Sequence, residues 1–317
     1  MQAPNVFAGP YLDRAAELRK DAAFLEHALR DPAAWIVPLW RSRSLVEKTE
    51  HGAQAVMLAA THQVRTQIED SQLIMLGRFR GRICFAAELQ ASEPPPALPD
   101  GASFEDLRLA GGLLCPDEAG LLAYARAMIH WRSRSRYCGR CGAQTQAVSA
   151  GHVARCGNPD CGSEQFPRLD PAVIVLVTDG ERAVLGRQAA WPAGRYSTIA
   201  GFVEPGESLE DAVCREVLEE TGIVVSGMRY HSSQPWPFPS SLMTGFIASA
   251  EPGSVIRVDD ELEDARWFGR ADIASGTPGL PPPQSVSFRL IEDWYDSGSD
   301  VPLRRTPGVK LWTSRPG

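Results

Sequence analysis

Three glutamates, Glu216, Glu219 and Glu220, stand at positions i, i+3 and i+4 in the stretch Gly201–Ile223, which reads GFVEPGESLEDAVCREVLEETGI. At about 100° per residue, Glu216 and Glu220 continue the helix face that begins with Leu209. Apolar side chains of such a helix face the core, so we expect these two carboxylates to point inward as well. A solvated helix would place its acids on the opposite face.

Carboxylates that lie close together in a protein interior cannot all stay charged without a partner. Like charges at short range raise each other's pKa or bind a cation. Ligands that offer only oxygen select hard ions such as Mg²⁺ and Mn²⁺, which also bind diphosphates. The glutamates therefore suggest a metal-dependent reaction on a diphosphate. Three acids alone fit a solvated surface helix better, so the longer pattern around them decides.

The helix that carries these acids has its own boundary signals. A turn with Pro205 and Gly206 precedes it. Ser208 followed by Asp211 is typical of a capping box, and Gly222 suits the left-handed residue after a helix end. We therefore expect a helix between Ser208 and Gly222 that presents the carboxylates on one face.

Four cysteines form a second group, spaced as C-x2-C, fourteen residues and C-x4-C: Cys138, Cys141, Cys156 and Cys161. Two cysteine pairs on tight turns can place four thiolates around one tetrahedral Zn²⁺. All four positions are then filled and no water site is left, so this zinc is predicted to be structural. The alternative is two unrelated pairs, one of them redox-active. His152 is a further candidate ligand that the site does not need.

Four arginines precede or interrupt the cysteine motif: Arg132, Arg134, Arg136 and Arg140. Such a run can meet the phosphates of a nucleotide or of an RNA end. More often it is the solvated last turn of a helix, where the macrodipole favours positive charge. We favour this second interpretation.

The chain around these motifs divides into three predicted domains. Residues 1–130 show a helical pattern and then the short β-like runs WIVPLW, AVMLAA, SQLIMLGRF and RICFAAEL, which predict an N-terminal α+β domain. A helical pattern from Asp117 to Arg134 leads into residues 131–166, the predicted zinc ribbon. In residues 167–317, the run AVIVLVT, further strands, the acidic helix and a final helix at Ser285–Trp294 predict an α/β domain with a mixed sheet.

Composition narrows the class of protein. With 317 residues the chain can build two domains, each with its own core. A net charge of −7 argues against a general nucleic-acid or membrane-surface binder but leaves room for a local basic patch. No apolar run approaches the roughly 20 residues that span a bilayer, and the N-terminus lacks the apolar region of a secretory signal. Seven cysteines, an odd number, fit a reducing compartment. We therefore expect a cytoplasmic protein, with Cys84, Cys115 and Cys214 as small core residues.

Downstream of the acidic helix, the stretch Ser233–Ser241 reads SQPWPFPSS. Prolines that alternate with Trp236 and Phe238 hold the backbone extended and rigid, with aromatic faces exposed at fixed spacing. Such a wall can order a flat heterocycle at low entropic cost. The alternative is a proline-rich surface loop, although such a loop seldom carries two large aromatic residues without a packing reason.

The acidic stretch resembles the Nudix box, G-x5-E-x7-R-E-U-x-E-E-x-G-U with U aliphatic. It matches at every specified position, from Gly201 through Glu207 and Arg215 to Ile223. The resemblance implies a metal-dependent diphosphate hydrolase with an α/β/α sandwich, in which the box forms a loop–helix–loop on one side of the sheet. The box defines the reaction class and not the substrate.

The stretch SQPWPFPSS resembles the array SQPWPFPxS, which marks the NADH pyrophosphatase subfamily of the Nudix hydrolases. Members of this subfamily also carry a zinc ribbon directly before the Nudix domain. The resemblance covers residues 120–295 strongly and the N-terminal third only by position. It implies hydrolysis of NADH or NAD⁺ to a nicotinamide mononucleotide and AMP, action on NAD-capped RNA ends, and a homodimer with sites near the interface.

The resemblance also assigns residues to roles. The metal positions of the subfamily correspond to Glu216, Glu220, Glu261 and the carbonyl of Ala200. Its substrate positions correspond to Phe202, Phe166, Gln234, Pro235, Trp236, Pro237, Phe238, Pro239, Ser240, Ser241, Glu261 and Ser287. Phe166 stands where the subfamily often has tyrosine, so stacking is kept while a hydroxyl hydrogen bond is lost. This aromatic position can be supplied by the partner subunit.

For the mechanism, we hypothesise that Glu216 and Glu220 hold Mg²⁺ or Mn²⁺ and that Arg215 orients the carboxylates. Glu219 is the candidate base or second-metal ligand. One alternative is a Nudix hydrolase for ADP-ribose or another nucleoside diphosphate derivative. A second is a non-catalytic zinc-ribbon module that binds RNA, which the complete set of acids disfavours.

Overall fold

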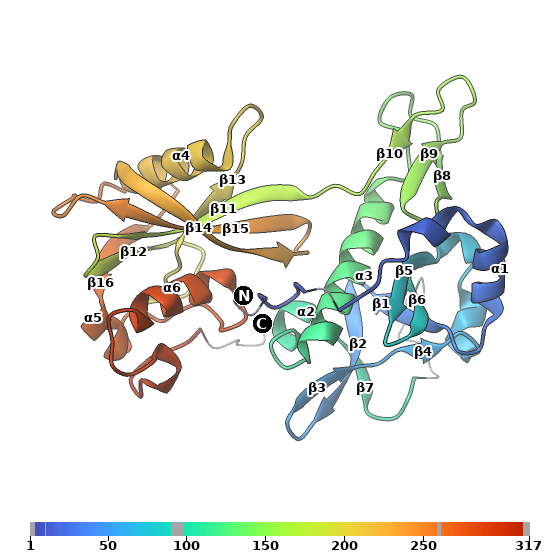
Figure 1. Cartoon of the computed structure of the whole chain (residues 1–317), viewed down its shortest axis with the longest axis horizontal. Coiled ribbons are helices and arrows are strands. Elements are labelled where there is room, and N and C mark those ends of the chain that lie inside the picture. Colours follow the sequence, from blue (N-terminus) through green and yellow to red (C-terminus); the bar gives the residue numbers. More distant parts are fainter. Residues whose placement is uncertain (1–3, 10, 90–97, 259–260, 313–317) are drawn as a thin grey trace. The chain divides into compact units, whose positions relative to one another are not determined.

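The computed structural model describes residues 4–9, 11–89, 98–258 and 261–312, and the chain forms two compact units. The C-terminal unit comprises Asp170–Gln234, the chain from Ser241 onward and Asn5. The N-terminal unit comprises Val6–Leu169 and Pro235–Ser240 (Figure 1). The short segment Pro235–Ser240 therefore packs with the N-terminal unit, although the residues before and after it belong to the other unit.

The C-terminal unit is built on a six-stranded mixed sheet in the order β14-β15-β11-β12-β16, with β13 paired to β11. Strands β11 and β15 run parallel, whereas β11 pairs antiparallel with both β12 and β13. The strands are β11 (Asp170–Thr178), β12 (Arg182–Arg187), β13 (Ile199–Phe202), β14 (Val225–Trp236), β15 (Ser241–Ala250) and β16 (Asp264–Gly269). The helices are α4 (Leu209–Thr221), α5 (Arg270–Ala274), α6 (Val286–Asp296) and the 3₁₀ turn η4 (Leu303–Arg305).

Helices α4 and α6 cover opposite faces of this sheet (Figure 1). Side chains alternate along a strand, so β11 contributes Ile174 and Leu176 to the core under α6, and Val173, Val175 and Val177 to the core under α4. A strand buried on both faces reads as a continuous apolar run, which is why AVIVLVT is recognisable in the sequence. The predicted α/β/α sandwich with a mixed sheet is confirmed.

Helix α4 begins and ends where its capping residues predict. The Ser208 hydroxyl oxygen accepts from the Asp211 N–H at 3.1 Å, and the Asp211 carboxylate accepts from the Ser208 N–H at 3.0 Å. Gly222 closes the helix at φ 68°, a conformation that costs glycine little. The caps set the bounds of the helix, and the packing of Ala212, Val213 and Val217 in the core beside β11 determines which glutamates face inward.

The N-terminal unit holds a seven-stranded sheet in the order β3-β2-β1-β6-β5, with β4 on β1 and β7 on β2, and a three-stranded ribbon in the order β10-β9-β8. The strands are β1 (Trp35–Trp40), β2 (Arg43–Thr49), β3 (Gly52–Ala55), β4 (Leu58–Ala59), β5 (Ile74–Phe79), β6 (Arg82–Glu88), β7 (Ala102–Glu105), β8 (Thr145–Val148), β9 (Val153–Cys156) and β10 (Glu164–Gln165). The helices are α1 (Ala22–Arg30), α2 (Leu107–Ala110), α3 (Pro116–Arg134) and the 3₁₀ turns η1 (Ala16–Lys20), η2 (Gln63–Gln67) and η3 (Asp70–Gln72). Apolar side chains of α3, among them Leu121, Leu122 and Met128, pack on this sheet.

The structure corrects three local expectations. The run AVMLAA is not one strand, because β3 ends at Ala55 and β4 begins at Leu58. Cys84 is buried as predicted, but Cys115 and Cys214 are exposed. Cys115 is the N-cap residue directly before α3, and Cys214 lies on the solvent side of α4. In the described part of the chain, no helix is long and apolar enough to cross a membrane.

The ribbon is fastened to the sheet of the N-terminal unit through the turn between β8 and β9. The Met75 N–H donates to the Ala150 carbonyl at 3.0 Å, and His152 Nε2 donates to the Met75 carbonyl at 2.7 Å. Gly151 has φ 88°, and a Cβ there would come within 3.0–3.2 Å of Ile74. The ribbon and the sheet therefore meet through backbone contacts that leave little room for a side chain.

We predict that His152 makes this junction sensitive to acid. Burial lowers the pKa of His152 to about 4 from its ordinary 6.5, despite the bond to Met75, and the nearby charges of Arg19 and Arg14 act in the same direction. Between about pH 4 and 6.5, His152 therefore binds a proton in the unfolded chain but not in the folded protein. Stability is therefore full above about pH 6.5 and falls by roughly 3 kcal/mol as the pH drops to about 4.

The measurement is denaturant unfolding of wild type and His152→Gln across this pH range, with zinc held in excess. The glutamine amide keeps a donor for Met75 and does not titrate. The free-energy difference between the two proteins should shift in favour of the variant as the pH falls. A difference that stays constant with pH contradicts the prediction.

Candidate active site and zinc cluster

Three carboxylates converge in the C-terminal unit: Glu216, Glu220 and Glu261 each offer an oxygen within 4.8 Å of the others. Glu216 and Glu220 are only 7% and 6% exposed on α4, as the helix pattern predicted. Glu261 is exposed and reaches the pair from the loop before β16. This set of oxygen donors, two of them buried, suits a hard divalent cation and supplies no soft ligand.

Strand β13 lies directly against this group. A Cβ built on Gly201 would fall 1.9 Å from the Glu216 carboxylate, so any side chain at this position would displace it. The neighbouring residue Ala200 pairs with Ile174 on β11. The strand that carries the predicted carbonyl ligand is therefore in van der Waals contact with the carboxylates, and the first glycine of the box has a steric explanation.

Arg215 binds four groups around the carboxylates. Its Nε donates to Glu207 at 2.6 Å, Nη1 donates to Glu216 at 2.8 Å and to Glu219 at 3.1 Å, and Nη2 donates to the Phe202 carbonyl at 2.9 Å. This interaction lowers the pKa of Glu207 to about 2 and raises that of Arg215. One guanidinium thus ties the box loop, α4 and β13 together.

The pKa values of the two buried carboxylates, Glu216 and Glu220, shift in the opposite direction from that of Glu207. Burial raises the pKa of Glu220 to about 8, and the charges of Glu216, Glu261 and Glu219 add to the effect. Burial also raises the pKa of Glu216, although Arg215 opposes it. Glu219 stands apart from the converging oxygens: its side chain is 56% exposed and its partner is Arg215.

A cluster of hydroxyl groups supports the chain that enters β13. The Ser287 hydroxyl lies 2.8 Å from both Ser197 Oγ and Thr198 Oγ1, and accepts from the Thr198 N–H at 3.2 Å. Ser287 is buried on α6. It therefore connects α6 to the segment before β13, and nothing in the sequence indicated Ser197 and Thr198 as its partners.

Gln234, the first of the array residues assigned to substrate, is fully buried. Its Nε2 donates to the Gln284 carbonyl at 2.7 Å, and its Oε1 accepts from the Val286 N–H at 2.8 Å. The amide therefore joins the end of β14 to the start of α6, which carries Ser287.

The aromatic residues of the array are half-buried rather than freely exposed, which corrects the expectation of open faces. Trp236 and Phe238 meet edge to face at a centroid distance of 5.0 Å, and Phe7 packs against both rings at 6.0 and 5.8 Å. The residues around them divide into buried Pro237, exposed Pro239, intermediate Pro235 and Ser240, and buried Ser241.

Two arginines hold this segment on the N-terminal unit. Arg126 Nε on α3 donates to the Pro237 carbonyl at 2.8 Å, its Nη1 donates to the Ser42 carbonyl, and its guanidinium lies 5.1 Å from the Phe238 ring. Arg108 lies 5.3 Å from the same ring. The sequence analysis missed Arg126, since its signal is a contact between segments 111 residues apart.

The four cysteines predicted to bind zinc come together: the Sγ atoms of Cys138, Cys141, Cys156 and Cys161 lie within 4.8 Å of one another. The N–H groups of Arg140 and Asn158 donate to Cys138 and Cys156 at 3.4 Å. Backbone donors favour the thiolate form, and they lower the pKa of Cys138 to about 6. Four closely grouped sulfurs fit tetrahedral Zn²⁺, and His152 lies elsewhere, on Met75.

The two remaining predicted substrate residues are exposed aromatics. Phe202 ends β13 in the C-terminal unit, and Phe166 follows the ribbon in the N-terminal unit. Large exposed rings of this kind are available for stacking.

We predict that the metal-free protein becomes less stable as the pH rises. The unfolded chain releases the Glu220 proton near its ordinary pKa of 4.5, whereas the folded site holds it to about 8. Stability is therefore lost between these values, and a divalent cation that replaces the proton restores it. Thermal unfolding should show a larger increase in Tm on adding Mg²⁺ or Mn²⁺ near pH 8 than near pH 6.

Glu220→Gln is the informative variant for this prediction, because glutamine stays neutral. The metal-free variant should melt above wild type near pH 8 and gain little from the cation. Glu210→Gln, an exposed change on the same helix, is the control. Equal cation effects at both pH values in wild type would count against the prediction.

Comparison with known proteins agrees with this geometry. A family model described as a NUDIX domain matches residues 168–289, one described as an NADH pyrophosphatase zinc ribbon domain matches 133–166, and one described as an NADH pyrophosphatase-like rudimentary NUDIX domain matches 33–131. The NAD-capped RNA hydrolase NudC of Stutzerimonas stutzeri is 38% identical over 275 residues, 87% of this chain and 94% of the relative.

Relatives from two other organisms match over shorter spans. The NAD-capped RNA hydrolase NudC of Mycobacterium bovis is 41% identical over 239 residues, 70% of this chain and 75% of the relative. The human NAD-capped RNA hydrolase NUDT12 is 42% identical over 193 residues, 56% of this chain and 42% of the relative. The chain belongs to the Nudix hydrolase family and carries the domain set of its NADH pyrophosphatase members.

Proposed function

We propose that this protein hydrolyses the diphosphate bond of NADH or NAD⁺ to a nicotinamide mononucleotide and AMP, and that it removes NAD caps from RNA 5′ ends. The observation that carries the proposal is the convergence of Glu216, Glu220 and Glu261 beside Arg215. The names of the relatives, which are NAD-capped RNA hydrolases, support the choice of substrate.

Glu216, Glu220, Glu261 and the Ala200 carbonyl would hold Mg²⁺ or Mn²⁺. The donor set fits, since it offers only oxygen and its carboxylates already stand within reach of one ion. When bound, the ion supplies positive charge that offsets the diphosphate and activates a water.

The side chains around these ligands have separate roles. Arg215 holds Glu216 in position through a charge-assisted bond, which keeps the carboxylate from rotating toward solvent. Glu219, exposed and bonded to the same guanidinium, is our candidate for the base that takes a proton from the attacking water. Phe202 follows Gly201 on β13 with its ring exposed, and this suits stacking on a base.

The array gives the N-terminal unit a role in substrate choice. Arg126, Arg108 and Phe7 fix the positions of Trp236 and Phe238, while Gln234 anchors the start of the array in the other unit. A pre-formed aromatic surface orders a nicotinamide or adenine ring at low entropic cost. We assign to it the preference for a dinucleotide.

We further propose a cytoplasmic homodimer. The free cysteines and the four-sulfur cluster suit a reducing compartment. Phe166 and Leu169, three residues apart after the ribbon, are both exposed, and such apolar residues are suited to a partner surface.

The direct test is product analysis with NADH and Mg²⁺ or Mn²⁺, which should yield AMP and reduced nicotinamide mononucleotide. Glu216→Gln should lower kcat/KM by about 100-fold or more, because the site loses a charged ligand. Glu210→Gln is the matched control on the exposed face of α4 and should keep wild-type turnover. Full turnover by a folded Glu216→Gln protein would refute the assignment.

The role of the N-terminal unit is tested by Arg126→Gln. Loss of the bond to Pro237 and of the stacked cation should loosen the array, so KM for NADH should rise about tenfold with little change in kcat. ADP-ribose lacks the nicotinamide ring, and its turnover should change less.

Arg82→Gln is the control, since it removes an arginine that stacks on Trp35 elsewhere in the same unit. If wild type prefers ADP-ribose to NADH, the second candidate function, an ADP-ribose hydrolase, replaces the first. If Arg126→Gln affects both substrates equally, the array has no part in discrimination.

A further inference from the structure

Three arginines of the run at the end of α3, Arg134, Arg136 and Arg140, are exposed as the sequence predicts, but Arg132 is not. Arg132 is half-buried, and its Nη1 is buried without a hydrogen-bond partner in the described part of the chain. Burial and the neighbouring charge of Arg136 lower the pKa of Arg132. No carboxylate among the described residues pairs with Arg132, Arg134, Arg136 or Arg140. A buried donor without a partner is costly, and an anion would satisfy it.

Arg132 and Arg136 line a cavity of about 560 Å³, which we call the helix pocket. The ring of Tyr137, 66% exposed, lies on its wall beside the amides of Gln72, Gln144 and Gln146. Two acids also line it, but each has a partner of its own: Glu69 accepts from the Ser71 hydroxyl, and Glu88 accepts from the Ser42 N–H. The pocket thus combines two cations, two carboxylates that accept hydrogen bonds, an aromatic face and amide groups.

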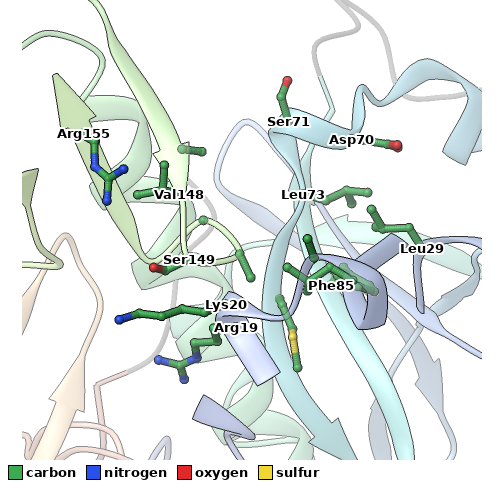
Figure 2. A pocket seen from close by; sticks show the side chains of 16 residues that line it. Arg19, Lys20, Leu29, Asp70, Ser71, Leu73, Phe85, Val148, Ser149 and Arg155 are labelled. Carbon is green, nitrogen blue, oxygen red and sulfur yellow. The ribbon is translucent and has the colours of Figure 1, made fainter. Parts of the chain in front are cut away.

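A second cavity of about 520 Å³, the turn pocket, is lined in part by the turn between β8 and β9 (Figure 2). Figure 2 shows Arg19, Lys20 and Arg155 on one side and the apolar side chains of Leu29, Leu73 and Phe85 on the other. Arg155 pairs with Glu164, whereas Arg19 Nε is buried without a hydrogen-bond partner among the described residues. An apolar wall opposite cations suits a ligand with a flat ring and a negative charge.

The two pockets are contiguous, because Ser71 and Ala147 line both. Their geometry is fixed by the bonds from Met75 to Ala150 and His152, which fasten the ribbon to the sheet. The turn that lines the second pocket has consecutive left-handed residues, Ser149 at φ 51° and Ala150 at φ 54°, a conformation that the surrounding structure must enforce.

We propose that the helix pocket and the turn pocket together form a binding track for single-stranded RNA. Arg132 and Arg136 contact one phosphate, and Arg19 and Lys20 contact the next. Bases stack on Tyr137 and on the apolar wall, with the glutamine amides at their edges. Alternating cations and flat surfaces are the usual means of holding single strands without sequence preference. The identity of the RNA as the body of a capped substrate rests on the proposed function.

The test is fluorescence anisotropy with a short, uncapped 5′-monophosphate RNA. The double variants Arg132→Gln/Arg136→Gln and Arg19→Gln/Lys20→Gln should each raise Kd about tenfold and flatten its dependence on salt. Arg43→Gln/Arg82→Gln removes the same charge from the same unit outside the track and should bind like wild type. Zinc content and the unfolding midpoint report on folding; should Arg132→Gln destabilise the unit, Arg136→Gln alone and the second double variant carry the test.

Each outcome bears on one claim. Track variants that bind RNA like wild type, or a control that loses as much affinity as they do, overturn the track. Equal competition by polyglutamate or by duplex RNA would assign the surface to an acidic protein or to general polyanions instead. If wild type fails to hydrolyse NADH yet binds RNA through the track, the proposed function fails and the track stands. If wild type hydrolyses both NADH and capped RNA while the track variants bind RNA normally, the proposed function stands and the track fails.

Discussion

The active-site half of this protein depends on one guanidinium. Arg215 joins the loop that holds Glu207, the helix that holds Glu216 and Glu219, and the backbone of β13 at Phe202. Its positive charge offsets Glu207 and Glu219 and part of the charge of Glu216, whereas burial and the neighbouring carboxylates make the charge of Glu220 costly. The fold thus concentrates unfavourable electrostatics at one point, where a bound divalent cation would relieve it.

Much of this region could be predicted from the sequence because the relevant physics is local. The capping residues Ser208 and Gly222 and the helix period placed Glu216 and Glu220 on the inner face, and paired cysteines placed the sulfurs together. The strand β11 was recognisable because it is buried on both faces. Each of these signals lies within a few residues of the feature it predicts.

The features that the sequence did not predict depend on contacts between segments that lie far apart in the chain. The half-burial of Trp236 and Phe238 follows from Phe7 and Arg126, which no spacing rule connects to the array. Cys214 looked like a core residue by type, but the rotation of α4 turns it to solvent. Composition likewise hid the partial burial of Arg132, because a run of like charges gives no sign of which member lies over a pocket. Residue types thus indicated which chemical groups the site contains, but not how buried each side chain is or what it contacts.

The assignment of Pro235–Ser240 to the N-terminal unit has a consequence for how such a protein can evolve. The chain passes from one unit to the other before and after this segment, as well as after Asn5 and after Leu169, so no single cut yields two self-sufficient pieces. A gene fragment that encodes only the catalytic half would keep the aromatic segment and lose the arginine and phenylalanine that shape it. Recombination that exchanges either unit must therefore also supply a surface that matches these six residues.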